Sequence, residues 1–247
     1  MDNPLYMQPE LRYGAPVCDE ILTGRFFTIG YSWYFRQAKW TLEIINRNNY
    51  LVGPVLTPVE RLDNFRADIR IPQRFRAGLG EYRGSGYDRG HLVSSANQIN
   101  QTIQNSETFL LSNMSPQKKE LNRFMWAKLE EKVRVLNTKP EILETYVLSA
   151  PVFYFQKPVE TIGKPDDLGI DIPIPHAFIK SVLAEDDKGR LSLWTFLMEN
   201  KELDGNIEDY LVKTYDAEQL VGGRFWDRIS GTDMHDQKRI ISKIWDY

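Results

Sequence analysis

The 247-residue sequence contains one cysteine, Cys18, and three histidines. A single thiol cannot form an intrachain disulfide, so the fold is not stapled, which is compatible with a reducing compartment without proving one. We expect Cys18 to be structural rather than reactive. Internal repeats and low-complexity segments are also missing from the sequence, so an array of repeated units is not expected.

Long apolar runs are missing as well. No segment approaches the roughly 18 apolar residues of a membrane span. The first ten residues, MDNPLYMQPE, contain neither an apolar secretory core nor an arginine-rich transit pattern. We therefore expect no membrane segment, and the cytoplasm is the default location.

The chain as a whole lacks an excess of basic residues, because its formal net charge is -3. This balance argues weakly against a nucleic-acid partner, whose polyanionic backbone favours basic faces. The charge is uneven, however: residues 61–91 contain seven arginines and four acidic residues, and the rest of the chain sums to -6. The arginine-rich segment is either a phosphate-binding strip on an acidic body or a solvated charged loop.

Apolar residues make up 42% of the sequence, enough for one large core, so we expect a single domain over residues 1–247. Aromatic and β-branched runs predict strands over 25–35, 38–46, 144–155, 175–184 and 190–198, the first two as a hairpin. Apolar periodicity predicts helices over 121–136, 216–221 and 236–245. Residues 47–60 are expected to be a loop, 1–24 an irregular N-terminal arm and 231–247 a C-terminal helical extension.

The segment Tyr87–Leu92, with the sequence YDRGHL, carries the chemistry that stands out. Hydrolysis of a phosphodiester needs an activated water, neutralisation of the charged transition state and stabilisation of the departing oxygen. A histidine suits the first task because its pKa lies near neutrality. An arginine fork suits the second, and a divalent cation held by Asn, Asp or Glu oxygens suits the third. By itself, His91 could equally be a satisfied core histidine.

Further motifs follow in a fixed order around this segment. They are RLDNFR at 61–66, GSGY at 84–87, TFLLSNMSPQ at 108–117, and Asn122 through Glu130 with Trp126 between them. Together with the DRGH motif at 88–91, this pattern resembles the DNA/RNA non-specific endonuclease family, the ββα-metal nucleases that include endonuclease G. The resemblance extends over roughly residues 25–230. It implies an α+β fold with a central antiparallel β-sheet flanked by helices and a ββα-metal catalytic unit.

The resemblance also assigns roles to the arginines. Arg61 matches the family arginine that contacts the scissile phosphate, although it could instead be a surface residue paired with Asp63. Arg66 is expected to bind substrate beside it. Because side chains alternate along a strand, Arg89 and His91 share one face and Asp88 points to the other. Arg89 is therefore expected at the phosphate, and Asp88 is expected, with Gly90, to support the structure.

Two residues on the predicted helix complete the expected site. After a second strand at 108–112, the helix presents Asn122, which the resemblance makes a direct ligand of Mg²⁺, with Mn²⁺ as the other candidate. The alternative for Asn122 is a helix cap. Glu130 lies eight residues later, about 12 Å along the axis at 1.5 Å per residue. It is therefore expected to reach the ion through a bound water, or else to form an ordinary solvated charge pair.

These residues predict a metal-dependent endonuclease of DNA, RNA or both, without sequence preference, in which His91 is the general base. Arg61, Arg89 and Glu130 complete the expected catalytic set, and the resemblance implies products with 5′-phosphate ends. Two alternatives remain open: a catalytically silent nucleic-acid-binding module, and a nuclease effector that is active only with a partner. An inhibitor or activating protein, a homodimer, and delivery into another cell are further expectations.

Overall fold

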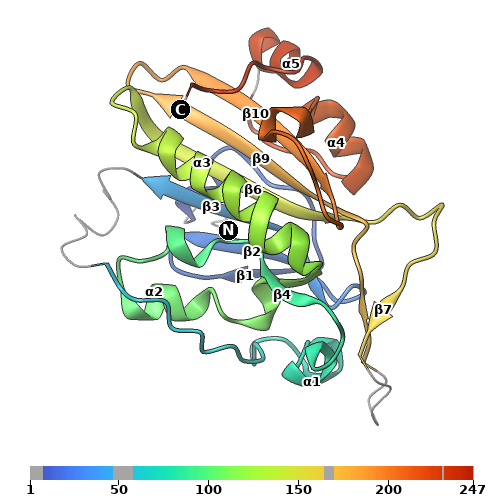
Figure 1. Cartoon of the computed structure of the whole chain (residues 1–247). Helices are drawn as coiled ribbons and strands as arrows, with labels where there is room; N and C mark the ends of the chain where they lie inside the picture. The colour runs from blue at the N-terminus through green and yellow to red at the C-terminus, as the bar shows by residue number, and fades with distance from the viewer. Residues whose placement is uncertain (1–7, 47–57, 164–169, 230, 247) are drawn as a thin grey trace, which may run out of the picture.

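The computed structural model describes residues 8–46, 58–163, 170–229 and 231–246. Within them the chain forms a seven-stranded sheet in the order β1-β2-β3-β6-β9-β10-β11, and every neighbouring pair is antiparallel (Figure 1). The strands are β1 (Glu20–Thr23), β2 (Phe27–Ser32), β3 (Gln37–Asn46), β6 (Ile142–Val152), β9 (Ala177–Asp186), β10 (Leu191–Glu199) and β11 (Leu211–Val212). The predicted antiparallel sheet, its opening hairpin and its three later strands are confirmed. Most of the predicted loop at 47–60 lies outside the described residues.

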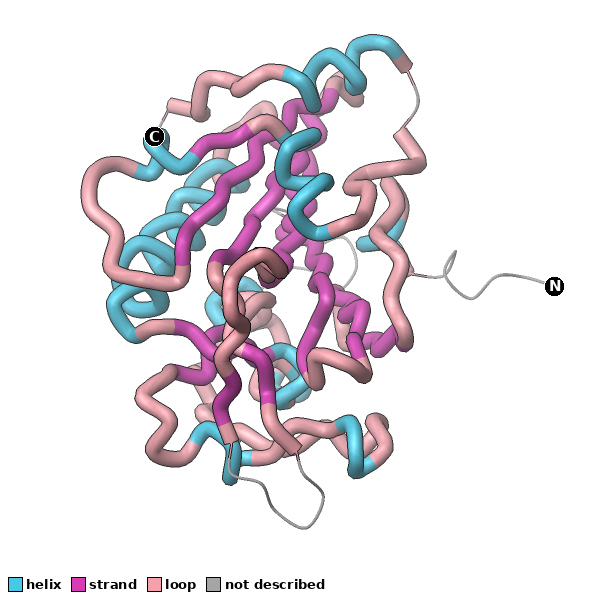
Figure 2. The backbone as a smooth tube through the Cα atoms, turned by 90° about the vertical axis from the view of Figure 1, so that its right-hand side faces the viewer, coloured by secondary structure: helices cyan, strands magenta, loops and turns pink. Residues whose placement is uncertain are grey.

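Both faces of the sheet are covered, which is why its central strands are apolar on both sides; every residue of β9 is buried. The helix α3 (Ala127–Asn137) packs Leu129 and Val133 on one face. The helices α4 (Thr214–Val221) and α5 (Thr232–Arg239) pack Ala217 and Met234 on the other. Figure 2 shows α3 to the left of the strands, along one side of the sheet. The α4 prediction is confirmed, and Gly222 ends this helix in the left-handed conformation.

A separate two-stranded sheet precedes α3 in the chain. Strand β4 (Asp88–His91) pairs antiparallel with β5 (Met114–Gln117), and the chain then enters the π-helix η6 (Leu121–Trp126), which continues directly into α3. This order is the predicted ββα unit. The wide π-helical turns at its start were not predicted, and such turns occur frequently at functional sites.

The predicted second strand at 108–112 is wrong. Those residues form a turn and enter the short 3₁₀ helix η5 (Leu111–Asn113), and the strand begins at Met114. The reason is the buried amide of Asn113, which donates to the carbonyl oxygens of Val93 and Thr108 and accepts from the Val93 N–H. The backbone therefore turns around the Asn113 side chain, and the extended strand begins at the next residue, Met114.

The remaining described elements are short. They are the two-stranded sheet of β7 (Thr161–Ile162) and β8 (Ile172–Pro173), the helices α1 (Leu79–Tyr82) and α2 (Thr102–Glu107), and the 3₁₀ helices η2 (Pro9–Leu11), η3 (Gln73–Phe75), η4 (Ser95–Asn97) and η7 (Ile207–Tyr210). In the described part of the chain, no helix is both long and apolar enough to cross a membrane.

The expected irregular N-terminal arm of residues 1–24 is wrong at residues 9–11 and 20–23, which form η2 and β1. Residues 20–23 form β1 and extend the sheet beside β2, and Leu22 lies in the core. Glu10 is also buried, and its carboxylate accepts a hydrogen bond from the hydroxyl of Thr28. The alternation of Ile21 and Leu22 is too short to distinguish from coil in the sequence, and only pairing with β2 makes it a strand.

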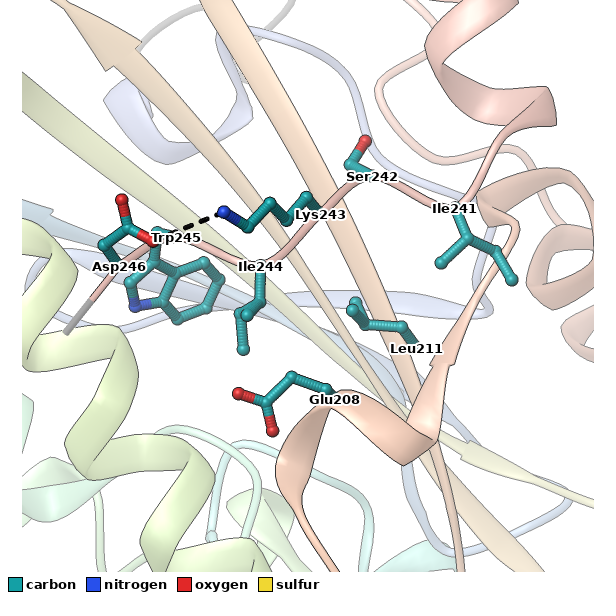
Figure 3. A pocket seen from close by; sticks show the side chains of 8 residues that line it. All are labelled: Glu208, Leu211, Ile241, Ser242, Lys243, Ile244, Trp245 and Asp246. Carbon is teal, nitrogen blue, oxygen red and sulfur yellow. Dashed lines mark ion pairs between the residues drawn. The ribbon is translucent and has the colours of Figure 1, made fainter.

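The C-terminal helix was predicted in the wrong place. Helix α5 ends at Arg239, and the chain then runs extended to Asp246 (Figure 3). Trp245 anchors this segment, because its ring packs edge-on against Trp194 at 5.0 Å and its Nε1 donates to the Lys132 carbonyl of α3. Trp194 in turn donates to the Lys243 carbonyl. These tertiary contacts hold the segment extended between the sheet and α3, although its sequence has helical periodicity.

We expect Trp245→Ala to lower the free energy of unfolding by about 3–5 kcal/mol, because the ring is 6% exposed and its removal leaves a cavity beside Trp194. Ile241 is 55% exposed in the same segment, so Ile241→Ala should change stability by no more than about 0.5 kcal/mol. Urea denaturation of both variants measures the difference. Equal losses in the two would show that the Trp245 contacts do not stabilise the fold.

Candidate active site

The helix η6–α3 runs alongside the segment that begins with β4, and three contacts along its length define the site. At its first turn, the Asn122 and Arg123 side chains donate to the carboxylate of Asp88. One turn later, Trp126 Nε1 donates to the His91 carbonyl at 3.2 Å. One turn further, Glu130 accepts from the Ser94 hydroxyl at 2.9 Å. The residues predicted to act together are thus brought into one row.

His91 is almost sealed from solvent, with 8% of its surface exposed. The rings of Phe65 and Phe109 meet it edge-on, with centroids 5.6 and 5.0 Å away, and they also pack edge-on against each other. Its Nε2 is buried and has no hydrogen-bond partner among the described residues. His91 is therefore held by packing of its ring, and it is not the satisfied core histidine that the sequence left open.

Two exposed arginines flank this aromatic cage. The Arg89 guanidinium lies 4.0 Å above the Phe65 ring, and that of Arg61 lies 4.9 Å from the Phe109 centroid. Such cation–π contacts orient a guanidinium while leaving its N–H groups available. The same two rings pack on His91, so the three predicted residues are gathered around one pair of phenylalanines. This geometry agrees with the predicted common face of Arg89 and His91.

Arg61 is also held by polar contacts. Its Nε donates to Asp63 at 2.8 Å and its Nη1 to the Ser95 hydroxyl at 2.7 Å. The ion pair with Asp63 that the sequence left open is therefore present, and a phosphate would compete with it. Asp63 has a φ of 49°, which is uncommon outside glycine and is a form of strain found at binding sites.

Phe65 and Phe109 are site residues that the sequence analysis did not identify. Both lie inside motifs that it singled out, but as apolar residues they carried no chemical signal. Their role depends on the fold, because Leu111 and Arg66 join the two segments through backbone hydrogen bonds.

The electrostatic setting of His91 is unusual. Burial, and then the charges of Arg61 and Arg89, lower the pKa of His91 to about 3. The ring is therefore neutral at pH 7, the form in which it can accept a proton. Because the unfolded chain binds this proton near pH 6.5 and the folded chain does not, His91 lowers stability as pH falls from about 6.5 toward 3 and has no such effect above.

Asn122 lies within the helix and does not cap it, because its backbone N–H already donates to the Lys118 carbonyl. The capping alternative is thus excluded. Its side-chain nitrogen donates to Asp88 at 3.0 Å, and in the described chain no donor contacts its Oδ1. Asp88 also pairs with Arg123 at 2.8 Å, and that hydrogen bond lowers the pKa of the Asp88 carboxyl. Asp88 thereby fixes which way the Asn122 amide points.

Glu130 uses only one carboxylate oxygen. Oε2 accepts from Ser94, whereas Oε1 is buried and has no partner among the described residues. A buried carboxylate oxygen without a donor is costly, so this position calls for a water or a cation. The solvated charge pair that the sequence left open does not describe this environment.

The Gln117 side chain packs directly against the backbone of Gly90. A Cβ at Gly90 would lie 2.0 Å from Oε1 of Gln117, so only glycine allows this approach. The Gln117 side chain is fully buried, and both of its amide atoms lack partners in the described structure. Gly90 thus lies where it supports this close packing, and Gln117 is a buried polar residue that the sequence analysis included in a motif but did not single out.

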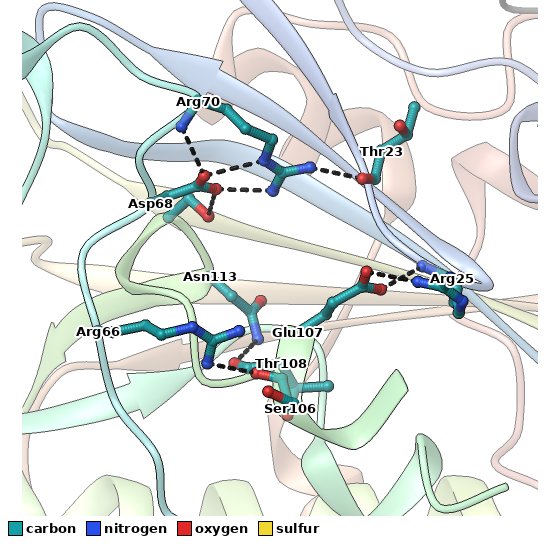
Figure 4. A network of polar contacts seen from close by, with 10 residues as sticks. Thr23, Arg25, Arg66, Asp68, Arg70, Ser106, Glu107, Thr108 and Asn113 are labelled. Atoms are coloured by element: carbon teal, nitrogen blue, oxygen red, sulfur yellow. Dashed lines mark hydrogen bonds and ion pairs between the residues drawn. The ribbon is translucent and has the colours of Figure 1, made fainter. Parts of the chain in front are cut away.

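The side chain of Arg66 bonds backbone carbonyl groups. Its Nη1 donates to the carbonyl oxygens of Asn64 and Ser106, so one edge of its guanidinium is already used (Figure 4). In the same view, Arg70 donates to the Asp68 carboxylate through Nε and Nη2 and to the Thr23 carbonyl through Nη1. Part of the arginine-rich segment therefore joins loops together, and Arg61 and Arg89 are the arginines that meet His91.

The polar groups around β4 and the helix fit a hydrated hard cation. Asn122 offers an amide oxygen, and Glu130 a buried oxygen that lacks a donor. In the described ranges no group of three or more His, Cys, Asp and Glu side chains gathers to hold a metal. A site with one amide ligand and several waters is of the kind that Mg²⁺ occupies, since it gives up its waters reluctantly.

Comparisons with known proteins agree with this geometry. The family model described as DNA/RNA non-specific endonuclease matches residues 10–231. Nuclease C1 of Cunninghamella echinulata var. echinulata is 29% identical over 92% of this chain and 90% of its own, and human mitochondrial endonuclease G is 30% identical over 85% and 71%. The solved structure entitled "Crystal structure of the EndoG/EndoGI complex: Mechanism of EndoG inhibition" superposes with a TM-score of 0.81 at 27% identity, covering 93% of this chain and 95% of that one.

We expect Arg89→Gln to raise the pKa of His91, because it removes one of the two positive charges that disfavour the imidazolium. An NMR pH titration can follow this, since the chain has only three histidines. His235, exposed in α5, gives a second histidine signal against which that of His91 is assigned. A His91 that titrates near 6.5 in the unaltered protein would contradict the buried, neutral ring.

Proposed function

This chain belongs to the DNA/RNA non-specific endonuclease family and is therefore an endonuclease that hydrolyses nucleic acid, and from this premise we propose a mechanism for its site. The observation that carries the proposal is the buried His91 ring, caged by Phe65 and Phe109 between two exposed arginines. A general base must be unprotonated, and a phosphate must be met by positive charge. Both conditions hold at this one place.

His91 is the general base in this proposal. Its ring accepts a proton from the water that attacks phosphorus, and the edge-on phenylalanines keep the imidazole from turning away. The phosphate approaching between Arg61 and Arg89 brings negative charge to the ring. That charge offsets the effect of the two arginines on the pKa of His91 and makes the imidazole a stronger base once substrate is bound.

The arginines bind and stabilise the phosphate. Arg61 and Arg89 present their guanidinium groups from the two aromatic faces, and Arg66 contributes positive charge from the neighbouring loop. Fixed cations aimed at developing charge accelerate phosphoryl transfer without reorganising during the reaction. Such contacts address the backbone rather than the bases, which supports hydrolysis without sequence preference in DNA, RNA or both.

Asn122 would hold the divalent ion directly through Oδ1, and Glu130 would hold one of its waters through Oε1. When bound, the ion would supply positive charge to the departing 3′ oxygen. Departure of that oxygen leaves a 5′-phosphate and a 3′-hydroxyl, the ends that the family resemblance implies. Mg²⁺ fits this oxygen-rich set best, with Mn²⁺ as the alternative. Asp88 fixes the amide of Asn122 so that its oxygen faces the ion.

Partners and location are also part of this proposal. The structural neighbour is a complex of an endonuclease with its inhibitor, which supports regulation of this chain by an inhibitor or activating protein. We further propose a homodimer and a cytoplasmic location, or delivery into another cell. A nucleic-acid-binding module without catalysis is the competing function, and binding that is insensitive to metal would favour it.

We expect the purified protein to degrade plasmid DNA, single-stranded DNA and RNA with Mg²⁺ and not with EDTA. His91→Ala should slow cleavage by about 10²-fold or more, the usual loss for a general base, because the site loses the group proposed to accept the proton. Asn122→Ala should remove the response to metal. His176→Ala is the matched control, since His176 bonds only backbone atoms of residues 154 and 158 and should leave the rate unchanged in a folded variant. Cleavage by His91→Ala at the wild-type rate would rule out this general base.

The two kinds of arginine should respond differently to substitution. Arg89→Gln should reduce cleavage and flatten the salt dependence of binding to a nonhydrolysable oligonucleotide, because it removes a phosphate contact. Arg70→Gln should leave both nearly unchanged and lower stability instead, since Arg70 is bonded to Asp68 and the Thr23 carbonyl. Fluorescence anisotropy at several salt concentrations separates the two. Equal salt slopes for Arg89→Gln and wild type would contradict the assignment of Arg89.

A further inference from the structure

A buried lysine lies beneath the helix that carries the candidate site. Lys180 of β9 is 1% exposed, and its Nζ donates to the hydroxyl of Ser149, which is directly opposite on β6, at 2.9 Å. Thr41 of β3 faces Ser149 on the other side, so three polar residues form a row across the centre of the sheet. Burying an ammonium is costly, and an apolar residue would suit the core better.

Lys180 reaches the His91 strand through one aromatic ring. Its Nζ lies 4.3 Å from the centroid of the fully buried Trp126 ring, a cation–π contact out of water. Nε1 of the same Trp126 ring donates to the His91 carbonyl. The ammonium of Lys180 thus packs on the Trp126 side chain, which connects the helix to the backbone of His91.

A buried glutamate on β3, which β6 separates from β9, connects to the segment after His91. Glu43 of β3 is 1% exposed, and its two oxygens accept from the side-chain amides of Asn97 and Gln98 at 3.0 and 2.9 Å. Asn97 also accepts from Arg134 of α3. Burial raises the pKa of Glu43 to about 7, and the charge of Lys180 opposes that rise.

Glu130 is linked both to the segment after His91 and to Lys180. It accepts from Ser94, in the same segment as Asn97 and Gln98, and its Oε1 is buried without a partner. Its negative charge acts on Lys180 together with that of Glu43, against the lowering of the Lys180 pKa by burial. In the described residues, Lys180 forms no ion pair within 4 Å with Glu43 or Glu130, and its Nζ donates to Ser149 instead. The lysine therefore acts on both carboxylates from a distance and does not occupy Oε1 of Glu130.

We propose that Lys180 is a positioning residue for the metal site: its buried ammonium packs on Trp126 and compensates the charge of Glu130, so that Glu130 would keep one oxygen for a water of the metal ion. This inference rests on the proposed function, because it requires a metal held by Asn122 and Glu130. It explains why a lysine occupies the centre of the core. Lys180 touches neither substrate nor ion, and its effect passes through Glu130 and Trp126.

The test is Mn²⁺ binding to the full-length protein, measured by isothermal titration calorimetry without nucleic acid. Lys180→Met should weaken Mn²⁺ binding by about tenfold, the usual effect of losing a group that orients a ligand. The same substitution in a Glu130→Gln background should weaken it no further, because the two residues act as one unit. Should Lys180→Met fail to fold, Lys180→Met/Glu43→Gln removes both buried charges and is measured in the same two backgrounds.

Thr195→Val is the matched control. Thr195 is a buried residue of β10 whose hydroxyl bonds Ser181 and Thr214 in another buried polar group of the sheet. It should lower stability and leave Mn²⁺ affinity unchanged. Thermal unfolding without metal reports the stability of every variant, so a loss of affinity can be separated from a loss of fold.

Two results overturn the inference while leaving the proposed function intact. One is Mn²⁺ affinity in folded Lys180→Met equal to that of wild type, with Asn122→Ala unable to bind. The other is an equal loss in the wild-type and Glu130→Gln backgrounds, which would make Lys180 a general structural residue. If wild type and Asn122→Ala respond identically to Mn²⁺, the proposed metal site itself fails, and the role of Lys180 fails with it.

Discussion

The alignment of one helix with one strand is the constraint on which the rest of the site depends. Asp88, the His91 carbonyl and Ser94 meet Asn122, Trp126 and Glu130 in turn, each about one helical turn from the last. None of these contacts would survive a slip of the helix by one residue, because its side chains would rotate by about 100°. The large sheet fixes the register, since α3 buries Leu129 and Val133 on it.

Aromatic packing sets the chemistry at the end of that strand. Phe65 and Phe109 exclude water from the His91 ring, which keeps it neutral, and they also provide faces for Arg89 and Arg61. The same two rings therefore desolvate His91 and hold the positive charge of the two arginines near it. Exposed arginines on a flexible loop would give the same net charge, but they would lose side-chain entropy on binding.

Errors in predicting the fold from sequence share one cause. The strand expected at 108–112 is displaced because Asn113 bonds to Val93, 20 residues away. The C-terminal residues are extended because Trp245 contacts Lys132, 113 residues away. In both segments the local pattern of apolar residues was read correctly. Local propensities amount to only a few tenths of a kcal/mol per residue, so a few distant contacts override them.

The sequence by itself determined the central strands, the helix that carries the candidate site and the identity of the polar residues, because alternation, periodicity and the order of the motifs can be read along the chain. It indicated His91 by residue type, and the family resemblance carried by the motifs added Asn122, Glu130 and the arginines. Only the tertiary structure decided the state of each one: the sealed and neutral ring of His91, the orientation of the Asn122 amide and the spare oxygen of Glu130. The buried Lys180 and Gln117 carried no signal of their own, because burial and contact depend on segments that meet only when the chain folds.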